Sequence, residues 1–350
     1  MVAKTRRMMP PTEFVRLSDE AAGLDGVIAI HSTARGPAAG GCRLWTYENS
    51  SEAMADACRL AEGMSYKNAM ANLPFGGGKA VLRLPRGDFN RRALFEAFGR
   101  AVQKLDGRYV TAEDVGTSVG DMEWVADQTR HVAGRTRLPG FAGGDPSPWT
   151  ALGIFEAMKA SLRFRMNSST SGVRVAILGV GNVGSELGRL LHAAGADLII
   201  ADIDARRCER LAGETNAKIV SVEELASMDA EVFAPCAMGR VLDEATIAAL
   251  RVQIVCGGAN NQLAGADSAN QLVSRGILYA PDYVVNAGGI INVAAEYLDE
   301  TEDQVKGRVM EIGPRTLSIF EQAANLGQNP AVTADRMAEE LMVQREPALA

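Results

Sequence analysis

The sequence predicts an α/β protein of two domains, the second of which is doubly wound around a parallel sheet. The chain has 350 residues, which is more than one ordinary hydrophobic core organises. Strand-like and helix-like segments alternate over residues 173–213, and this order is typical of parallel strands joined by crossover helices. A segment rich in Gly and Pro, RTRLPGFAGGDPSP at residues 135–148, predicts a hinge between the domains.

The first domain contains strand-like and helix-like segments in alternation. Short apolar runs predict the strands, and apolar residues at helical spacing predict the helices. In chain order these elements cover residues 26–33 (strand), 51–72 (helix), 80–84 (strand), about 90–105 (helix) and 108–114 (strand).

The second domain begins with a long helix, which we expect over residues 150–164. Strand, helix, strand and helix follow at residues 173–180, 185–195, 197–204 and 205–213. From about residue 302 the chain is charged, with apolar residues near helical spacing. We therefore expect it to end in helices, with a frayed tail at residues 346–350.

The composition predicts a soluble globular protein with a small-molecule partner. Hydrophobic residues make up 47% of the chain, and no apolar run approaches the roughly 20 residues that a bilayer span needs. The basic amino terminus, MVAKTRRMMPP, precedes neither an apolar segment nor a cleavage site of small residues, so we expect a cytoplasmic location. A net charge of −7 without a Lys/Arg stripe argues against a nucleic-acid partner.

The five cysteines are odd in number and scattered, and no two of them form a CxxC pair. This spacing argues against a disulfide framework and against a structural zinc site. We expect reduced thiols and no bound metal.

A glycine fingerprint, GVGNVG, lies between an apolar strand and a helix. Its first glycine suits a tight turn, its second lets the backbone approach a pyrophosphate, and its third lets helix and strand pack closely. Asp202 ends the next strand and follows Gly179 by 23 residues (202 − 179), close to the spacing of the acid that binds the ribose hydroxyls. The predicted dinucleotide-binding residues are therefore Gly179, Gly181, Asn182, Val183, Gly184 and Asp202.

The carboxylate of Asp202 favours NAD over NADP, because it would repel a 2′-phosphate. Arg206 and Arg207 lie near enough in sequence to accommodate such a phosphate, but a solvated helix face explains them equally well. We therefore expect NAD as the cofactor.

The three histidines are His31, His131 and His192, and none stands beside a plausible partner in the sequence. We interpret each as structural. A hydroxy-acid dehydrogenase, which would need a catalytic histidine, is therefore disfavoured, and so is a zinc enzyme.

Two lysines and one carboxylate remain as candidates for proton transfer. Lys79 follows three glycines in PFGGGKAVLRL, and these glycines could let water and a reacting carbon come close to its amine. A lysine in such a poorly solvated place can act as a base near neutral pH. Lys67 would suit a substrate carboxylate, and Asp114 follows a strand among small residues. The alternative interpretation is that both lysines are exposed charges.

Eight motifs together resemble the family of glutamate, leucine, phenylalanine and valine dehydrogenases. They follow one another from about residue 28 to residue 297 and span both domains. The motifs are GPAAGGCRLWTY, GMSYKNA, PFGGGKAV, TAEDVGT, DPSPWTALGIFEAMKA, APCAM, GGANNQL and PDYVVNAGGIINVAAE.

The resemblance implies reversible, NAD-dependent oxidative deamination of an L-amino acid to its 2-oxo acid and ammonium. It implies an N-terminal α/β substrate domain with a mixed sheet and a Rossmann NAD-binding domain, with the active site in the cleft between them. Residues 1–140 would form the substrate and oligomerisation domain, joined by C-terminal helices at about 325–350, and residues 141–324 would form the Rossmann domain. The family forms homo-oligomers, so we expect one here.

The resemblance also implies roles for single residues. Lys67 would pair with the substrate α-carboxylate, Lys79 would activate the water that attacks the imine, and Asp114 would pass protons to and from the amino nitrogen. Gly40 would offer its backbone to the substrate. Asn260 would lie where nicotinamide and substrate meet, and the cofactor would also contact Thr150, Cys236 and Ala237.

The side-chain pocket implied by the resemblance is apolar. Relatives that bind glutamate have a lysine where this chain has Ala39 and a serine where it has Val293, so a γ-carboxylate would be unpaired here. Ala112 and Ile290 would complete the wall. The motif wording is nearest to leucine and valine dehydrogenases, whereas Ala39 and Cys42 occur among aromatic-specific relatives, so a preference for phenylalanine or tryptophan stays open.

Two further points remain open from the sequence. Arg240, in APCAMGR, stands where relatives often have a glycine, which leaves the local geometry undetermined. A relative that binds NAD without turnover is the alternative of another class, but such a relative would be free to lose Lys67, Lys79 and Asp114.

Overall fold

The computed structural model describes residues 11–136, 141–237 and 239–343, and these form two compact units. Unit 1 contains the described residues of 1–144, together with residues 292–305 and 337–343. Unit 2 contains the described residues of 145–291 and residues 306–336.

These units differ in detail from the boundaries that the sequence suggested. Unit 1 extends to Gly144, takes in residues 292–305, and regains the chain at Met337 rather than at about 325. Helix α13 (Ile312–Leu326) stays in unit 2 because it packs against α4 (Ser147–Met166), with the rings of Phe164 and Phe320 5.3 Å apart. The suggested tail at 346–350 lies outside the described residues.

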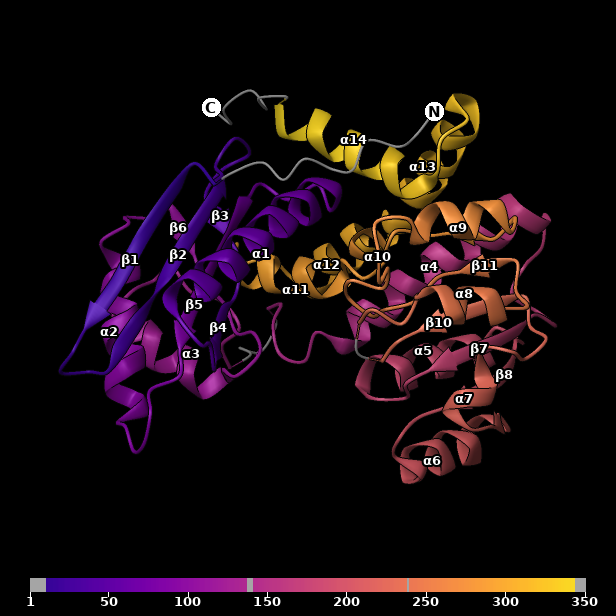
Figure 1. The fold of residues 1–350 in the computed structure, drawn as a ribbon, viewed down its shortest axis with the longest axis horizontal. Helices are drawn as coiled ribbons and strands as arrows, with labels where there is room; N and C mark the ends of the chain where they lie inside the picture. Colours follow the sequence, from indigo (N-terminus) through magenta and orange to yellow (C-terminus); the bar gives the residue numbers. More distant parts are fainter. Residues whose placement is uncertain (1–10, 137–140, 238, 344–350) are drawn as a thin grey trace. The chain divides into compact units, whose positions relative to one another are not determined.

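Unit 1 is built on a mixed six-stranded sheet (Figure 1). The strand order is β1-β2-β5-β3-β6, and β4 also pairs with β5. The β1/β2 and β2/β5 pairs are antiparallel, whereas β3 and β4 run parallel to β5. The strands are β1 (Glu13–Asp19), β2 (Leu24–Ser32), β3 (Ala38–Ala39), β4 (Cys42–Trp45), β5 (Gly76–Arg83) and β6 (Tyr109–Val110).

Helices cover both faces of this sheet. Because successive strand residues point to opposite faces, Val27, Ala29 and Val81 pack with the alanines of α1 (Ser50–Met70). Ile28, Ile30, Ala80 and Leu82 share the other core cluster with residues of α2 (Arg91–Gln103) and α3 (Val119–Ala126). Lys79 has the parity of Val81, so its side chain belongs to the α1 face.

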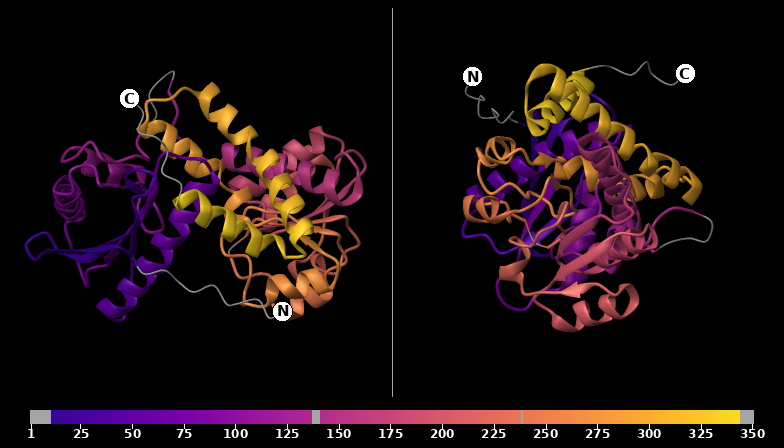
Figure 2. Two further views of the ribbon diagram at one scale, coloured as in Figure 1. Left: turned by 90° about the horizontal axis from the view of Figure 1, so that it is seen from above. Right: turned by 90° about the vertical axis from the view of Figure 1, so that its right-hand side faces the viewer.

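Unit 2 contains an all-parallel six-stranded sheet of order β12-β11-β10-β7-β8-β9, with helices in the connections. Figure 2 shows the ribbon of these helices and strands, coloured from magenta to orange, in two further views. The order reverses between β7 and β10, as in the doubly wound dinucleotide-binding fold. Val175 and Ile177 are buried on one face, and Ala176 belongs to a core cluster on the other. The strands are β7 (Arg174–Leu178), β8 (Asp197–Ala201), β9 (Lys218–Ile219), β10 (Val232–Pro235), β11 (Ile254–Val255) and β12 (Leu278–Tyr279).

The remaining helices connect these strands or close the chain. Between the strands of unit 2 lie α5 (Asn182–Ala193), α6 (Ala205–Thr215), α7 (Val222–Leu225), α8 (Glu244–Ala249) and α9 (Ser268–Ser274). After β12 come α10 (Asp282–Val285), α11 (Gly288–Tyr297), α12 (Glu302–Met310), α13 and α14 (Pro330–Val343). The predicted fold class, an α/β protein with a mixed sheet and a doubly wound Rossmann-like domain, is confirmed.

Several predicted element boundaries were wrong. The strand expected at residues 108–114 is shortened to β6, Tyr109–Val110, and the helix expected at 185–195 begins earlier, as α5. The strand expected at residues 80–84 begins at Gly76, so the three glycines and Lys79 are part of β5. Helix α4 begins at Ser147, inside the predicted hinge, because Pro148 fits the first turn of a helix.

Among the described residues, no helix combines the length and the apolar character that a membrane crossing requires.

Candidate active site

The three glycines of β5 are required by close neighbours on both faces of the sheet. A Cβ on Gly76 would lie 2.7 Å from the carbonyl carbon of Ser32. One on Gly77 would lie 2.6 Å from Cα of Ser65 on α1, and one on Gly78 would lie 2.9 Å from the ring of Tyr109. The space that the sequence suggested for water and substrate at these positions is occupied by the protein itself. The glycines therefore bring α1 and β5 together beside Lys79.

Lys79 is a buried amine with a carboxylate partner. The residue is only 4% exposed, and its Nζ lies 2.8 Å from Oδ2 of Asp114. Asp114 lies beyond the end of β6, where its backbone N–H donates to the Thr117 hydroxyl at 2.8 Å. The structure thus brings together the two residues that the sequence predicted as catalytic.

A second cation, Arg43, shares the same carboxylate oxygen. Its Nε donates to Oδ2 of Asp114 at 3.0 Å. Burial raises the pKa of the Asp114 carboxyl, but the charges and hydrogen bonds of Lys79 and Arg43 outweigh burial and hold the pKa below its ordinary value. Asp114 is therefore ionised at neutral pH.

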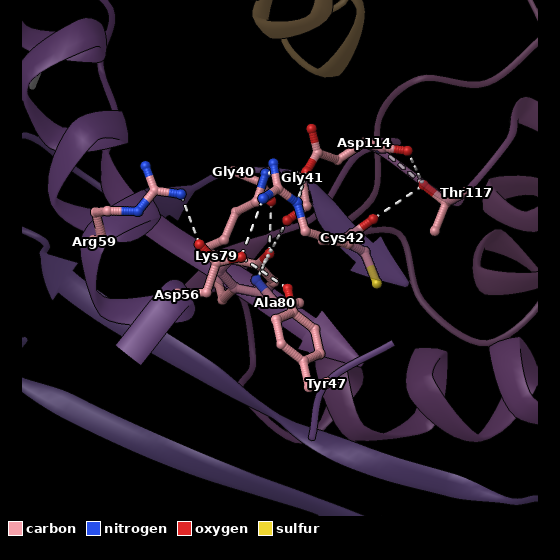
Figure 3. A network of polar contacts seen from close by, with 12 residues as sticks. Gly40, Gly41, Cys42, Tyr47, Asp56, Arg59, Lys79, Ala80, Asp114 and Thr117 are labelled. Atoms are coloured by element: carbon pink, nitrogen blue, oxygen red, sulfur yellow. Dashed lines mark hydrogen bonds and ion pairs between the residues drawn. The ribbon is translucent and has the colours of Figure 1, made fainter. Parts of the chain in front are cut away.

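Arg43 also begins a chain of alternating charges that continues onto α1. Figure 3 labels the Tyr47, Asp56 and Arg59 side chains of this chain. Its Nη1 donates to Oδ2 of Asp56 at 3.1 Å. Asp56 also accepts a hydrogen bond from the Tyr47 hydroxyl at 2.7 Å and pairs with Arg59 at 2.6 Å. Successive side chains of a strand point to opposite faces of the sheet, and Arg43 pairs in register with Val81. The Arg43 side chain therefore lies on the same face as Lys79, the face covered by α1.

Tyr109 ties the strand that carries Lys79 to the glycine turn that precedes β4. Its buried hydroxyl donates to the carbonyl of Gly40 at 2.6 Å and accepts the backbone N–H of Ala80 at 3.0 Å. These two bonds fix the backbone on either side of the candidate site.

The Tyr109→Phe variant is expected to lose about 1–3 kcal/mol of unfolding free energy, because it leaves a buried N–H and a buried carbonyl without this partner. Urea denaturation followed by circular dichroism measures this loss. An unchanged midpoint with an unchanged slope would show that the hydroxyl does not hold the two strands together.

The other residues expected around the substrate in unit 1 lie on neighbouring elements. Ala39 on β3 pairs with Gly77 and with Val110, and both Ala39 and Ala112 are 8% exposed. A Cβ on Gly40 would lie 3.0 Å from the carbonyl carbon of Gly78, so this position needs glycine for close backbone approach. Lys67 is half-buried in the last turn of α1.

Three further substrate candidates lie on or near α11 and β11. Ile290 and Val293 are three residues apart on α11, which places them on one face of this helix, and both are half-buried. Asn260 follows β11 in unit 2, is exposed, and accepts a hydrogen bond from Nδ2 of Asn286 at 2.8 Å. Their contact with a substrate stays a prediction.

The glycine fingerprint forms the turn between β7 and α5 in unit 2. Gly179 has φ +91°, and a Cβ there would lie 2.7 Å from the backbone N of Ala237. Gly184 packs its α-carbon against the carbonyl of Gly179. Gly181 faces open space, where a Cβ would meet only Arg207 Nη1 at 3.6 Å, and α5 begins there without a side-chain cap. The open N-terminus of α5 fits a pyrophosphate.

Asp202 follows β8 beside this turn. Its Oδ2 accepts the backbone N–H of Val180 at 2.7 Å, and its Oδ1 accepts that of Asp204 at 2.9 Å. Each carboxylate oxygen keeps a further lone pair, so the residue can also accept hydrogen bonds from ribose hydroxyls. Arg207 pairs with Asp204 at 3.4 Å, and Arg206 is exposed.

The remaining cofactor candidates lie at the ends of unit 2 elements. Thr150, in the first turn of α4, donates its hydroxyl to the Pro146 carbonyl at 3.0 Å. Cys236 and Ala237 follow β10, beside Gly179 and Gly184. Arg240 has φ +64°, a conformation that favours glycine, and its guanidinium donates to the carbonyl of Ala264 at 3.0 Å. Glycine, which the resemblance led us to expect at this position, adopts such a left-handed backbone without strain.

The histidines take part in other contacts. His31 Nδ1 lies 2.7 Å from the Ser65 hydroxyl, His131 Nδ1 lies 3.0 Å from the Tyr297 hydroxyl, and His192 is exposed on α5. In the part of the chain that the structure describes, no group of three or more His, Cys, Asp or Glu residues could hold a metal ion. The five cysteines are free.

The sequence interpretation missed Arg43, Tyr47, Asp56 and Tyr109. Arg43 and Tyr47 lie within the GPAAGGCRLWTY motif, and Asp56 lies on the helix that carries Lys67. The available signal was the charged Arg43 between the apolar Cys42 and Leu44, both of which are buried. In a strand, Arg43 must face the side of the sheet opposite to these two residues.

Comparison with known proteins supports the resemblance seen in the motifs. The family model described as "Glu/Leu/Phe/Val dehydrogenase, dimerisation domain" matches residues 11–131, and that described as "Glutamate/Leucine/Phenylalanine/Valine dehydrogenase" matches residues 200–345. The chain is 44% identical to a leucine dehydrogenase of Thermoactinomyces intermedius, with 94% of this chain and 90% of the relative covered. It is also 44% identical to a valine dehydrogenase of Streptomyces albus, with 95% and 92% covered.

Among solved structures, L-tryptophan dehydrogenase from Nostoc punctiforme superimposes with a TM-score of 0.87 at 37% identity, covering 95% of this chain and 96% of that one. The sequence, the two sheets and these matches agree. The chain therefore belongs to the family of glutamate, leucine, phenylalanine and valine dehydrogenases and is an amino-acid dehydrogenase, an oxidoreductase.

Proposed function

We propose that the chain catalyses the reversible, NAD-dependent oxidative deamination of an apolar L-amino acid to its 2-oxo acid and ammonium. The observation that supports this most directly is the ion pair between the buried Lys79 amine and the half-buried Asp114 carboxylate. Such a pair suits proton transfer at an amino nitrogen and at a carbon that must take up water.

In the proposed mechanism, the Lys67 ammonium pairs with the substrate α-carboxylate and so orients the Cα–H bond. Asp114 removes a proton from the substrate ammonium, because only a neutral amine can lose hydride. When bound, NAD would supply the acceptor for the hydride that Cα loses. Neutral Lys79 then takes a proton from the water that adds to the imine carbon. Asp114 returns a proton to the nitrogen, and ammonia leaves as the carbonyl forms. The proton of the hydroxyl that becomes the carbonyl passes back to the freed Asp114 carboxylate.

The dinucleotide would be held by unit 2. Gly179, Gly181 and Gly184 leave the backbone at the start of α5 accessible to the pyrophosphate, and Asp202 would accept hydrogen bonds from the ribose hydroxyls. The Asp202 carboxylate disfavours a 2′-phosphate, and Arg207 is already paired with Asp204. These contacts support NAD rather than NADP.

We infer that the preferred substrate has a branched aliphatic side chain, such as leucine or valine. Ala39, Ala112, Ile290 and Val293 offer no charge to a γ-carboxylate, which would be costly to bury unpaired. Relatives named leucine and valine dehydrogenase share 44% of their residues with this chain, whereas the tryptophan dehydrogenase shares 37%. A preference for phenylalanine or tryptophan, which the small Ala39 would permit, is the second candidate.

The experiment is a ranking of specificity constants. NADH formation is followed with leucine, valine, isoleucine, phenylalanine, tryptophan and glutamate at alkaline pH, with NAD and then NADP. We expect the aliphatic substrates to rank first and glutamate last, with NAD preferred. The reverse reaction is expected to require ammonium. A first rank for glutamate, or reduction of the 2-oxo acid without ammonium, would overturn the proposal.

We further propose that the protein acts as a homo-oligomer in the cytoplasm. The match of residues 11–131 to a family model described as a dimerisation domain supports the first point, and five unpaired cysteines agree with a reducing compartment. Light scattering after size-exclusion chromatography measures the oligomeric state, and a monomer would contradict the proposal.

A further inference from the structure

One charged cluster of unit 1 has no role in the mechanism above. It consists of Arg43, Asp56, Tyr47 and Arg59, of which Figure 3 labels the last three. Arg43 joins this cluster to the candidate catalytic pair through Asp114. The Arg43 and Asp56 side chains are 20% and 17% exposed, so water screens the pair only in part.

Arg43 is held at both ends. Its Nε donates to Asp114 at 3.0 Å and its Nη1 to Asp56 at 3.1 Å. Burial raises the pKa of the Asp56 carboxyl, but the Tyr47 hydroxyl, Arg59 and Arg43 outweigh it and hold the pKa below its ordinary value. Asp56 therefore remains an anion that fixes the guanidinium in place.

We propose that Arg43 is a positioning residue for the reaction: it holds the Asp114 carboxylate in place and keeps it ionised while Lys79 is uncharged. The proposal rests on the proposed function of Lys79 and Asp114. A guanidinium is protonated throughout the working pH range, whereas an amine that acts as a base must lose its charge.

The reason is the charge balance around a mostly buried carboxylate. When Lys79 is neutral, its ion pair with Asp114 disappears, and an unpaired buried carboxylate would tend to take up a proton. Arg43 leaves Asp114 with a permanent cation on the same oxygen. Asp114 can then stay ionised after Lys79 has lost its proton. It is free to accept the proton of the substrate ammonium.

Two other titratable groups near Asp114 do not supply such a charge. Burial raises the pKa of the Cys42 thiol on β4 and of the Tyr109 hydroxyl on β6, so both are neutral near pH 7. The cations that lower the pKa of the Asp114 carboxyl most are Lys79 on β5 and Arg43 on β4. Tyr47, after β4, and Asp56 and Arg59, on α1, belong to the cluster that Arg43 joins, and Lys67 lies in the last turn of α1.

The test compares Arg43→Met and Arg43→Lys with the wild-type enzyme. Arg43→Met removes the charge at similar side-chain length and is expected to lower kcat for deamination about 100-fold, with the Kd for NADH unchanged. Arg43→Lys restores a cation and is expected to recover at least about 10-fold of this loss. Arg83→Met, which removes another half-buried arginine of the same sheet with an Asp25 partner, is the matched control and is expected to keep wild-type kcat.

Asp56→Asn provides a second, independent variant. It removes the anion that anchors Arg43 and is expected to lower kcat about 10-fold, with no additional loss when it is combined with Arg43→Met. A kcat within about threefold of wild type for Arg43→Met, or equal losses in Arg43→Met and Arg83→Met, would overturn the inference. Wild-type turnover by Lys79→Ala would instead overturn the proposed function.

Discussion

Lys79→Ala is expected to lower kcat for oxidative deamination by about 10²–10⁴-fold, the range associated with loss of a general base. Lys79 is 4% exposed and pairs with Asp114 at 2.8 Å, so solvent offers no equivalent group at this position. The Kd for NADH is expected to change less than twofold, because the residues proposed to hold the dinucleotide belong to unit 2. Steady-state kinetics and NADH fluorescence titration measure the two quantities.

The same substitution is expected to leave the protein folded. Asp114 keeps Arg43 as a partner at 3.0 Å, so the variant does not leave a buried carboxylate without a cation. Lys159→Ala is the matched control: Lys159 pairs with Glu156 on α4, and its side chain is 46% exposed. This variant is expected to keep wild-type kcat. Turnover of Lys79→Ala at the wild-type rate would remove Lys79 from the mechanism.

The doubly wound unit could be predicted from the sequence because its signals are local. Strands β7 and β8 are each a nearly continuous run of apolar residues, and the GVGNVG motif marks the turn between β7 and α5. The short strand β3 could not be predicted. It has two residues, too few for a periodic pattern, and it exists because it pairs with β5 and with β6. The sequence did predict a strand around β6, at residues 108–114, but only Tyr109–Val110 of it form a ladder.

The residues of the candidate site likewise divide into those that the sequence could predict and those that it could not. Lys79 and Asp114 stand out locally, one after glycines and the other after a strand. Arg43 and Asp56 do not, because their roles depend on the parallel register that sets Arg43 opposite Val81 and turns it toward α1. Such a register is a property of the folded sheet, and a strand of four residues does not specify it alone.

The three glycines before Lys79 are conspicuous in the sequence, but the reason for them lies in residues that are distant in the sequence. The sequence correctly marks a place where side chains are excluded, but it suggests open space for substrate and water. In the structure the excluded volume belongs to Ser32, to Ser65 on α1 and to the ring of Tyr109. Glycine inside a strand often has this meaning, a close approach of another backbone.

Gly77→Ala is expected to lower the free energy of unfolding by about 3 kcal/mol or more, at the upper end of the cost of overpacking a core. The added methyl would lie 2.6 Å from Cα of Ser65, and closer still to the backbone nitrogen and hydroxyl of that residue. These atoms belong to the interior of α1, so relief requires a shift of the helix rather than of one side chain. Urea denaturation monitored by circular dichroism measures the loss.

Gly63→Ala is the matched control because Gly63 lies on α1, is exposed, and a Cβ there would meet nothing within 4 Å beyond its chain neighbours and the backbone of its own helix. Alanine is the better helix former, so this variant is expected to gain about 0.5–1 kcal/mol. Opposite signs for the two variants would show that the packing of α1 on β5 requires glycine at 77. If Gly77→Ala unfolded at the wild-type midpoint but lost turnover, the glycine would instead serve the approach of substrate to Lys79, as the sequence alone suggested.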